Sequence, residues 1–379
     1  MDYSKTIKLP QTDFSMRANL PQREPELIKA QKENRIYEKL LAHNSEKELF
    51  ILHDGPPFAN GDIHMGHALN KILKDIVVKN KAMTGFKTPF VPGWDTHGLP
   101  IEQQAIKKLG VDRFAAGEVK FRQICKEFAE KYINNQITQF ERLGVIGEYD
   151  NPYITYIHEF EAKQIEVFGE MAKKGYMYRG LKPVYWCPDC QTALAEAEIE
   201  YADSVSNSIY VKFKVSNDLG KISKVIGNAD EVYFVIWTTT TWTLPGNVAI
   251  SLNPDYVYAF VKTGNETYVI AKELVESFCK ECELSDCEII GEIEGSELEL
   301  VECQHPFLDR KSLVIVGDHV TLDAGTGCVH TAPGHGVEDY IVCKNYPQLP
   351  IVVPVDGKGV LTEEAGEFSG LYYKKSNKV

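Results

Sequence analysis

The sequence lacks any long hydrophobic run. No apolar stretch among its 379 residues approaches the roughly 20 residues that are needed to cross a bilayer. Residues 1–5 are polar, so they do not form the apolar core of a signal peptide. We therefore expect no membrane association and a cytoplasmic location.

The sequence also lacks a surplus of positive charge. Lys and Arg number 41 against 54 Asp and Glu, and the formal net charge is −13. This balance excludes a general nucleic-acid coat and leaves room only for local basic patches that contact phosphates. The nine cysteines are an odd count in a chain expected to be cytosolic, so we expect metal ligands or buried thiols and no disulfide framework.

What is present is an ordinary globular composition, with 44% hydrophobic and 25% charged residues, and a length that suits two or three domains. Residues 49–52 are apolar and end in a Gly-Pro-Pro loop, which predicts a buried strand. Over residues 66–82 the apolar positions follow a spacing of 3, 4, 7 and 8, which predicts an amphipathic helix. A second turn-rich stretch covers residues 89–100. This order is typical of the opening of a parallel α/β sheet.

The pattern changes along the rest of the chain. Before the first strand a helix is predicted over residues 26–41, and residues 101–180 look mainly helical. Beyond a Cys-x-x-Cys turn, period-two alternation and short apolar runs predict a β-rich domain. The predicted divisions are an N-terminal extension, an α/β region with helices, the Cys-x-x-Cys turn, the β-rich domain and a return segment with a polar tail, at residues 1–48, 49–180, 181–200, 201–345 and 346–379.

The segment His64-Met65-Gly66-His67 stands where a loop becomes a helix. Unpaired N–H groups and the helix dipole favour anions at such a point. Two histidines add donors, and Gly66 lets a flat ring or a phosphate approach the backbone. Taken alone, the four residues fit a nucleotide triphosphate and a plain helix cap with surface histidines about equally.

The flanking residues decide between these readings. Residues 55–61 read Gly-Pro-Pro-Phe-Ala-Asn-Gly, and residues 93–102 read Gly-Trp-Asp-Thr-His-Gly-Leu-Pro-Ile-Glu. With them, residues 50–104 closely resemble the class I aminoacyl-tRNA synthetases, and within these the isoleucine-specific branch of bacterial type. Met65 is a mild departure from the usual Ile of the family signature.

The resemblance implies ATP-dependent formation of isoleucyl-adenylate, with Mg²⁺, and transfer of isoleucine to tRNA-Ile. It implies that the histidines stabilise the triphosphate, and the candidate catalytic residues are His64, His67 and Lys71. Those for binding substrate and nucleotide are Pro57, Phe58, Gly66, Gly93, Asp95 and His97. Asp95 would pair with the α-ammonium, although a helix N-cap is its alternative reading. The lysines of this helix, Lys71 included, are otherwise typical of a solvated face or of a contact to the tRNA backbone.

A threonine run at residues 238–241 and a segment rich in Gly, His and acids at residues 325–340 form a second constellation. A threonine run by itself is ordinary strand chemistry. Together the two segments resemble the editing domain of the same family, which hydrolyses Val-tRNA. Isoleucine exceeds valine by one methylene, which gives a binding pocket only about 1–3 kcal/mol of discrimination. This is the established reason why the family edits.

The resemblance assigns the editing pocket residue by residue. Asp339 would fix the ammonium of the mischarged amino acid, Thr240 and its neighbours would hold the ester and the water, and His330 would exclude isoleucine. The matching editing residues are Thr239, Thr240, Asn247, His330 and Asp339. Thr241 replaces the usual Pro of the family.

Cys187 and Cys190 form half of a zinc site. The resemblance implies that the other ligand pair, and so zinc, belongs to a longer enzyme beyond residue 379. The other cysteines of the β-rich domain, at positions 279, 282, 287 and 303, we interpret as buried or surface thiols.

The expected fold is the first half of a doubly wound, Rossmann-like parallel sheet with an inserted β-rich editing domain. No Lys-Met-Ser-Lys-Ser-like loop occurs, so we expect a fragment, a truncated gene product, or one piece of a split enzyme that a complementary chain completes. For this chain alone we expect weak or absent aminoacylation and better-preserved hydrolysis of Val-tRNA. Two alternatives stay open, a free-standing trans-editing aminoacyl-tRNA hydrolase and a non-enzymatic tRNA-binding remnant.

Overall fold

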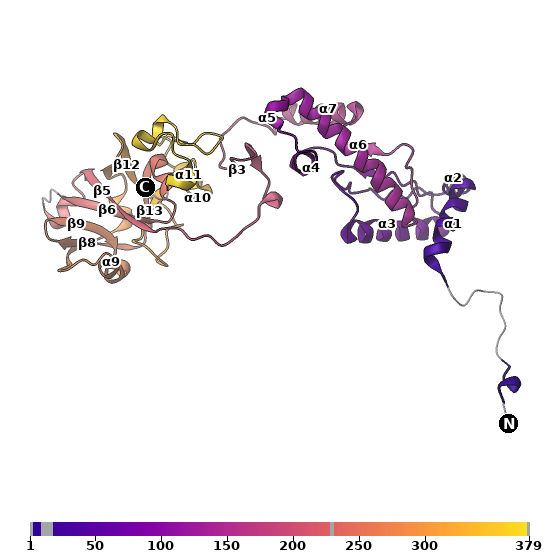
Figure 1. Ribbon diagram of the computed structural model, residues 1–379. Helices are drawn as coiled ribbons and strands as arrows, with labels where there is room; N and C mark the ends of the chain where they lie inside the picture. The colour runs from indigo at the N-terminus through magenta and orange to yellow at the C-terminus, as the bar shows by residue number, and fades with distance from the viewer. Residues whose placement is uncertain (1–2, 9–17, 228–230, 377–379) are drawn as a thin grey trace. The chain divides into compact units, whose positions relative to one another are not determined.

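A computed structural model describes residues 3–8, 18–227 and 231–376. The chain divides into two compact units, Met1–Tyr178 and Arg179–Val379, called unit 1 and unit 2 below (Figure 1). The sequence-based boundaries within these units stay predictions. In the parts that the structure describes, no helix combines the length and the apolar character that a membrane span requires.

Unit 1 is mainly helical. Its helices are η1 (Ser4–Thr6), α1 (Leu20–Glu33), α2 (Ile36–His43), α3 (Met65–Met83), α4 (Leu99–Leu109), α5 (Arg113–Ala116), α6 (Glu118–Arg142) and α7 (His158–Lys173). Strands β1 (Gly93–Trp94) and β2 (Tyr153–Ile154) pair in parallel. Arg35, with a left-handed φ of 50°, separates α1 from α2, so the single helix expected over residues 26–41 is two helices. The core contains Trp94 and Phe140.

The predicted buried strand at residues 49–52 is wrong. Leu49 makes an isolated parallel bridge to Lys87, while Leu49 and Ile51 are exposed. A single bridge supplies no ladder of hydrogen bonds, so the segment stays irregular. Parallel pairing is nevertheless present in unit 1, at this bridge and between β1 and β2.

The predicted helix over residues 66–82 is confirmed as α3, but its buried face is not the expected one. The apolar stripe is exposed, at Leu69, Ile72, Leu73, Ile76 and Val77. The buried positions are instead Lys71, Asp75, Val78 and Ala82. Burial of charged groups requires partners for them, and Asp54 pairs with Lys71 while Lys79 pairs with Asp75.

Unit 2 is built on a large mixed sheet, as the period-two pattern predicts. Nine strands lie in the order β10-β8-β9-β6-β5-β11-β12-β7-β13. Their bounds are β5 (Ile209–Asn217), β6 (Val232–Thr238), β7 (Ala249–Leu252), β8 (Val257–Thr263), β9 (Glu266–Ala271), β10 (Glu288–Glu294), β11 (Glu302–Gln304), β12 (Lys311–Val316) and β13 (Cys328–Thr331). The β6–β9 and β7–β12 pairs are parallel. The Cys-x-x-Cys turn joins a separate hairpin of β3 (Tyr185–Cys187) and β4 (Thr192–Leu194).

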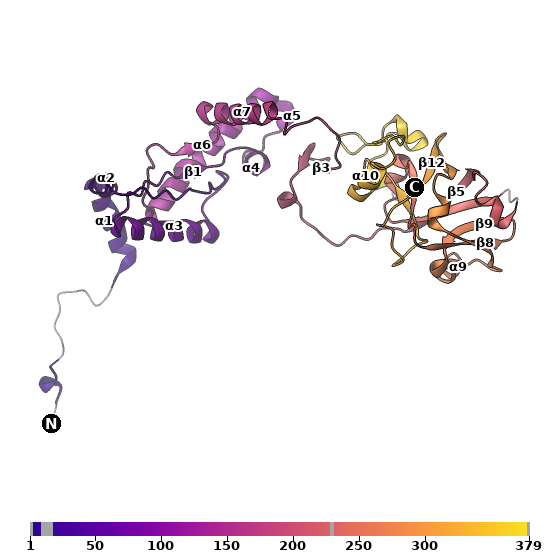
Figure 2. The same ribbon diagram turned by 180° about the vertical axis from the view of Figure 1, so that it is seen from behind.

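Short helices accompany the sheet. They are η2 (Glu196–Glu198), α8 (Ser223–Ile226), η3 (Thr241–Gly246), η4 (Lys272–Leu274), α9 (Val275–Glu281), η5 (Gly295–Leu298), α10 (Val337–Cys343), η6 (Glu363–Phe368) and α11 (Tyr373–Ser376). Helix α9 lies beside β8 and β9 in both views (Figures 1 and 2), where Phe278 packs with Val261 and Ile270.

The prediction of free thiols is wrong for two of the cysteines. Cys279 of α9 and Cys287, which precedes β10, form a disulfide, whereas Cys282 and Cys303 are free thiols as expected. The turn after α9 brings the two ends of an eight-residue separation together. Sequence spacing does not indicate such proximity.

Candidate active sites

In unit 1 the two histidines form the N-terminus of α3. His64 is the N-cap, and its Nδ1 accepts from the backbone N–H groups of Gly66 (3.1 Å) and His67 (3.4 Å). His67 Nδ1 accepts in return from the backbone N–H of His64 (3.3 Å), and the two rings stack with centroids 3.7 Å apart. Because both Nδ1 atoms accept, each neutral ring carries its proton on Nε2, free for an anion. Burial, and then the nearby His64 and Lys71, lower the pKa of His67.

Beneath this helix lies a buried carboxylate that the sequence reading does not single out. Asp54 is completely buried and accepts from Lys71 Nζ, from Lys74 Nζ (2.9 Å) and from the backbone N–H of Gly93 (3.0 Å). The solvated-face reading is therefore wrong for Lys71 and Lys74, whose side chains are 2% and 16% exposed. Whether Lys71 takes part in catalysis stays a prediction.

The remaining substrate-binding candidates lie on two adjacent segments. The Asp95 N–H donates to the Pro57 carbonyl (2.9 Å), and Phe58 and Asp95 form a parallel bridge. The Asp95 carboxylate accepts weakly from the His97 N–H (3.4 Å). The N-cap of α4 is Gly98, so the helix-cap reading of Asp95 is wrong.

Gly93 is required by a close approach. A Cβ at this position would lie 2.0 Å from the Tyr153 ring. The Tyr153 hydroxyl in turn donates to the Asp54 carbonyl (2.6 Å). His97 is half-exposed, with Nε2 3.5 Å from the Glu161 carboxylate.

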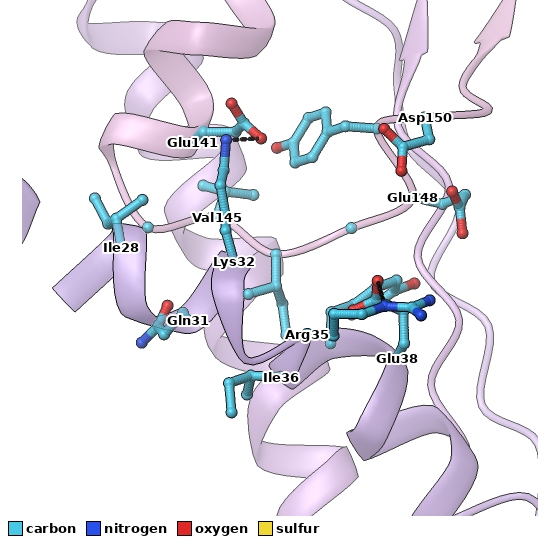
Figure 3. Close-up of a pocket in the computed structure, with 15 residues that line it drawn as sticks. Ile28, Gln31, Lys32, Arg35, Ile36, Glu38, Glu141, Val145, Glu148 and Asp150 are labelled. Atoms are coloured by element: carbon cyan, nitrogen blue, oxygen red, sulfur yellow. Dashed lines mark hydrogen bonds and ion pairs between the residues drawn. The ribbon is translucent and has the colours of Figure 1, made fainter. Parts of the chain in front are cut away.

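Unit 1 also has a hollow of about 420 Å³ away from these residues. Figure 3 shows Lys32 ion-paired with Glu141, and Arg35 and Glu38 on the same side of the hollow. None of the predicted site residues of unit 1 is in its lining. The hollow is therefore not part of the predicted site of unit 1.

In unit 2, a directed chain of hydrogen bonds links three of the editing candidates, Asn247, His330 and Thr240. Asn247 Nδ2 donates to His330 Nδ1 (2.8 Å), and His330 Nε2 lies 3.0 Å from the Thr243 hydroxyl. That hydroxyl donates to the Thr240 carbonyl (2.8 Å). Since Nδ1 accepts, the His330 proton is on Nε2 and points to Thr243. Burial lowers the pKa of His330 to about 3, so the ring is neutral.

Two members of this network are absent from the sequence reading. Thr243 is buried within the chain of hydrogen bonds, and Ser312 donates to the Asn247 side-chain oxygen. The signal for Thr243 is its place beside the threonine run, at the start of the Thr-Leu-Pro string. Ser312 lies in an unremarkable strand, so the sequence offers no comparable signal for it.

Asp339 and Thr239 lie outside this chain of hydrogen bonds. Asp339, in the first turn of α10, accepts from the Ala332 N–H (2.7 Å), two residues after His330. Burial raises the pKa of its carboxyl, against the lowering effect of that hydrogen bond. Thr239 is exposed, and its carbonyl accepts from the Ser206 hydroxyl (2.6 Å).

Unit 2 has a cavity of about 570 Å³ whose lining contains none of the five editing candidates. Its lining includes Trp242, Gly334, His335, Trp186 and Tyr373. The Trp242 and His335 rings meet edge to face at 5.1 Å, and burial lowers the pKa of His335 to about 4. His305 Nε2 lies 3.0 Å from the Leu244 carbonyl, and burial lowers the pKa of this histidine to about 4 as well.

The Cys-x-x-Cys turn has knuckle geometry. The Cys190 N–H points to Cys187 Sγ at 3.3 Å, which suits a thiolate. Structural zinc needs four ligands, and among the described residues no group of three or more His, Cys, Asp or Glu is arranged to hold a metal. The described residues therefore do not complete a zinc site.

Comparisons with known proteins identify the family of the chain. The family "tRNA synthetases class I (I, L, M and V)" matches residues 26–300, and the chain belongs to this family. Within it, the chain is 60% identical to the isoleucine–tRNA ligase of Thermoanaerobacter sp. (strain X514) and 61% identical to that of Caldicellulosiruptor saccharolyticus. Each match covers 100% of this chain but 41% of the relative, so the chain spans less than half the length of these proteins.

A solved structure is also similar. The ternary complex of Agrobacterium radiobacter K84 agnB2 LeuRS–tRNA–LeuAMS matches with 17% identity and a TM-score of 0.43, over 89% of this chain and 44% of that chain.

Proposed function

We propose that this chain carries isoleucine–tRNA ligase chemistry in two places. Unit 1 would form isoleucyl-adenylate from isoleucine and ATP for transfer to tRNA-Ile, and unit 2 would hydrolyse Val-tRNA. The observation that carries the proposal is the 60% identity over all 379 residues to an isoleucine–tRNA ligase. A cytoplasmic location and a complementary chain belong to the same proposal.

In unit 1, the arrangement supports positioning and charge stabilisation rather than covalent catalysis. The Nε2–H groups of the stacked His64 and His67 rings would donate to the triphosphate at the positive end of α3. Asp95 would hold the substrate ammonium beside Pro57 and Phe58. Mg²⁺ carried by the triphosphate would neutralise phosphate charge, and we assign no side chain to it.

In unit 2, the hydrogen-bonded chain would hold the Thr240 backbone against the ester. A neutral His330 fixed at both ring nitrogens would exclude the larger side chain of isoleucine. Asp339, held by the Ala332 N–H, would bind the ammonium of valine. The smaller amino acid would then be hydrolysed.

Two assays on the purified chain test the proposal. Unit 1 is tested by isoleucine-dependent ATP–pyrophosphate exchange, in which valine should support a lower rate than isoleucine. Unit 2 is tested by deacylation of Val-tRNA, which Asp339→Ala should abolish. Glu338→Ala, on the same turn but exposed, is the matched control. Equal deacylation rates for Asp339→Ala and the unchanged chain would refute the editing assignment.

One observation favours a second candidate, a trans-editing hydrolase. All five editing candidates lie in unit 2, which is compact by itself. Deacylation without any exchange would support that candidate. Exchange above background would favour the ligase.

A further inference from the structure

The buried Asp54 joins three segments that the sequence separates. Its carboxylate accepts from Lys71 and Lys74 of α3 and from the backbone of Gly93 in β1. It is also the residue that precedes the Gly-Pro-Pro loop. One side chain therefore links the helix that begins with the two histidines, the loop that contains Pro57, and the strand that leads to Asp95.

The contacts around Asp54 leave little freedom. Asp54 is 0% exposed and Lys71 2%, and a carboxylate that accepts charge-assisted hydrogen bonds at such burial is held in one geometry. A Cβ at Gly55 would lie 3.7 Å from Lys74 Nζ, so this ammonium lies against the loop itself. The Tyr153 hydroxyl fixes the Asp54 carbonyl from the side of β2.

The charges do not balance. Two ammonium groups meet one carboxylate, so a positive charge remains below the first turns of α3. Lys71 is one turn beyond His67, and its charge lowers the pKa of that histidine. The residual charge favours an anion at the histidines, since a buried charge is screened less than a surface charge, whereas the lowered pKa keeps the His67 ring neutral.

Helix α3 contains a second buried acidic residue of unit 1, Asp75, with which Asp54 can be compared. Asp75, one turn after Lys71, is also buried and ion-paired, with Lys79 Nζ at 2.6 Å. Its other oxygen accepts from the Ile146 N–H (3.0 Å), so it holds α3 to the segment after α6. Asp75 has the chemistry of Asp54, but its partners are Lys79 of the same helix and Ile146, not the Gly-Pro-Pro loop or the Asp95 segment.

We propose that Asp54, through Lys71, Lys74 and Gly93, is a positioning residue for adenylate formation: it aligns the histidine turn, the Gly-Pro-Pro loop and the Asp95 segment on one substrate. This inference rests on the function proposed for unit 1. It assigns Lys71 a supporting role under the site and no contact with ATP.

The test compares two matched double variants of the full chain. In Asp54→Asn/Lys71→Met the carboxylate and one ammonium are removed together, because loss of Asp54 alone would leave two buried ammonium groups unpaired and endanger folding. Asp75→Asn/Lys79→Met removes the other pair from the same helix. Both variants are checked by circular dichroism, and both retain the two histidines.

Two readouts are measured. In ATP–pyrophosphate exchange, misalignment in Asp54→Asn/Lys71→Met should lower kcat on the order of 100-fold and leave the KM for ATP within about threefold, as expected when binding groups persist but are not aligned. Independently of activity, amide hydrogen exchange at residues 93–95 should accelerate, and the ring resonances of His64 and His67 should shift. The Asp75→Asn/Lys79→Met variant should show none of these changes.

The outcomes separate this inference from the proposed function. If the unchanged chain shows no exchange with isoleucine, the proposed function of unit 1 fails, and the amide and histidine measurements still decide whether Asp54 aligns the segments. Unchanged amides and histidine rings in Asp54→Asn/Lys71→Met would overturn the inference. Equal losses in both double variants would also overturn it, because they would show general destabilisation of α3.

Discussion

The hydrogen-bonded chain in unit 2 makes Thr243→Val the sharpest single substitution. Thr243 is 7% exposed and its hydroxyl connects His330 Nε2 with the Thr240 carbonyl. Valine keeps the shape but removes both interactions, and it leaves the His330 N–H buried without an acceptor. A buried unsatisfied donor costs about 1–3 kcal/mol and a lost hydrogen bond about 1 kcal/mol. We therefore expect unit 2 to lose about 2–4 kcal/mol of unfolding free energy.

The effect on hydrolysis should exceed what this loss of stability explains. Without its hydroxyl contact the Thr240 carbonyl keeps the Thr243 N–H (3.3 Å), and His330 is free to turn. A displacement of about 1 Å at a reacting centre costs on the order of 100-fold in rate. The measurement is Val-tRNA deacylation per folded molecule, at a temperature where urea titration shows that the variant is native.

The matched control is Thr326→Val. Thr326 is equally buried, and its hydroxyl donates to the Val235 carbonyl (2.6 Å) and accepts from the Cys328 N–H (3.2 Å). The Thr326→Val variant should lose a similar amount of unfolding free energy but deacylate Val-tRNA at the unchanged rate. If Thr243→Val deacylates like the unchanged chain, or if both variants lose rate equally, the hydrogen-bonded chain does not position Thr240.

Three further predictions follow from burial and packing. Desolvation lowers the pKa values of His305, His330 and His335 to about 3 to 4, so these histidines bind protons more readily when unfolded. Stability should therefore fall as the pH drops below about 6.5, by on the order of 2 kcal/mol per histidine at pH 5, and a flat urea midpoint between pH 7 and pH 5 would contradict this. Closing the loop between Cys279 and Cys287 should add about 2–3 kcal/mol, so dithiothreitol should lower the unfolding free energy of unit 2 by that amount but leave Cys279→Ser/Cys287→Ser unaffected. Gly93→Ala, whose Cβ would meet the Tyr153 ring at 2.0 Å, should destabilise unit 1 by about 1–3 kcal/mol; Tyr153→Leu in the same chain should restore part of that loss, and failure of this rescue in thermal unfolding would exclude the clash as the cause.

The sequence by itself determined the features that depend on neighbouring residues. His64 and Gly66 predict a helix start, and α3 begins at Met65 with His64 as its cap. The period-two alternation around residue 210 predicts a strand, and β5 covers Ile209–Asn217 in a nine-stranded sheet. Local periodicity and capping chemistry decide such elements, because they act over a few residues.

The tertiary structure decided which side of each element is used. The apolar spacing of α3 predicts burial of Leu73, yet Lys71 is buried instead, because Asp54 lies below that face of the helix. The partners of His330 likewise lie 83 and 87 residues away, at Asn247 and Thr243. A buried charge or imidazole is stable only where distant segments bring it a partner, and hydrophobic periodicity carries no information about such partners.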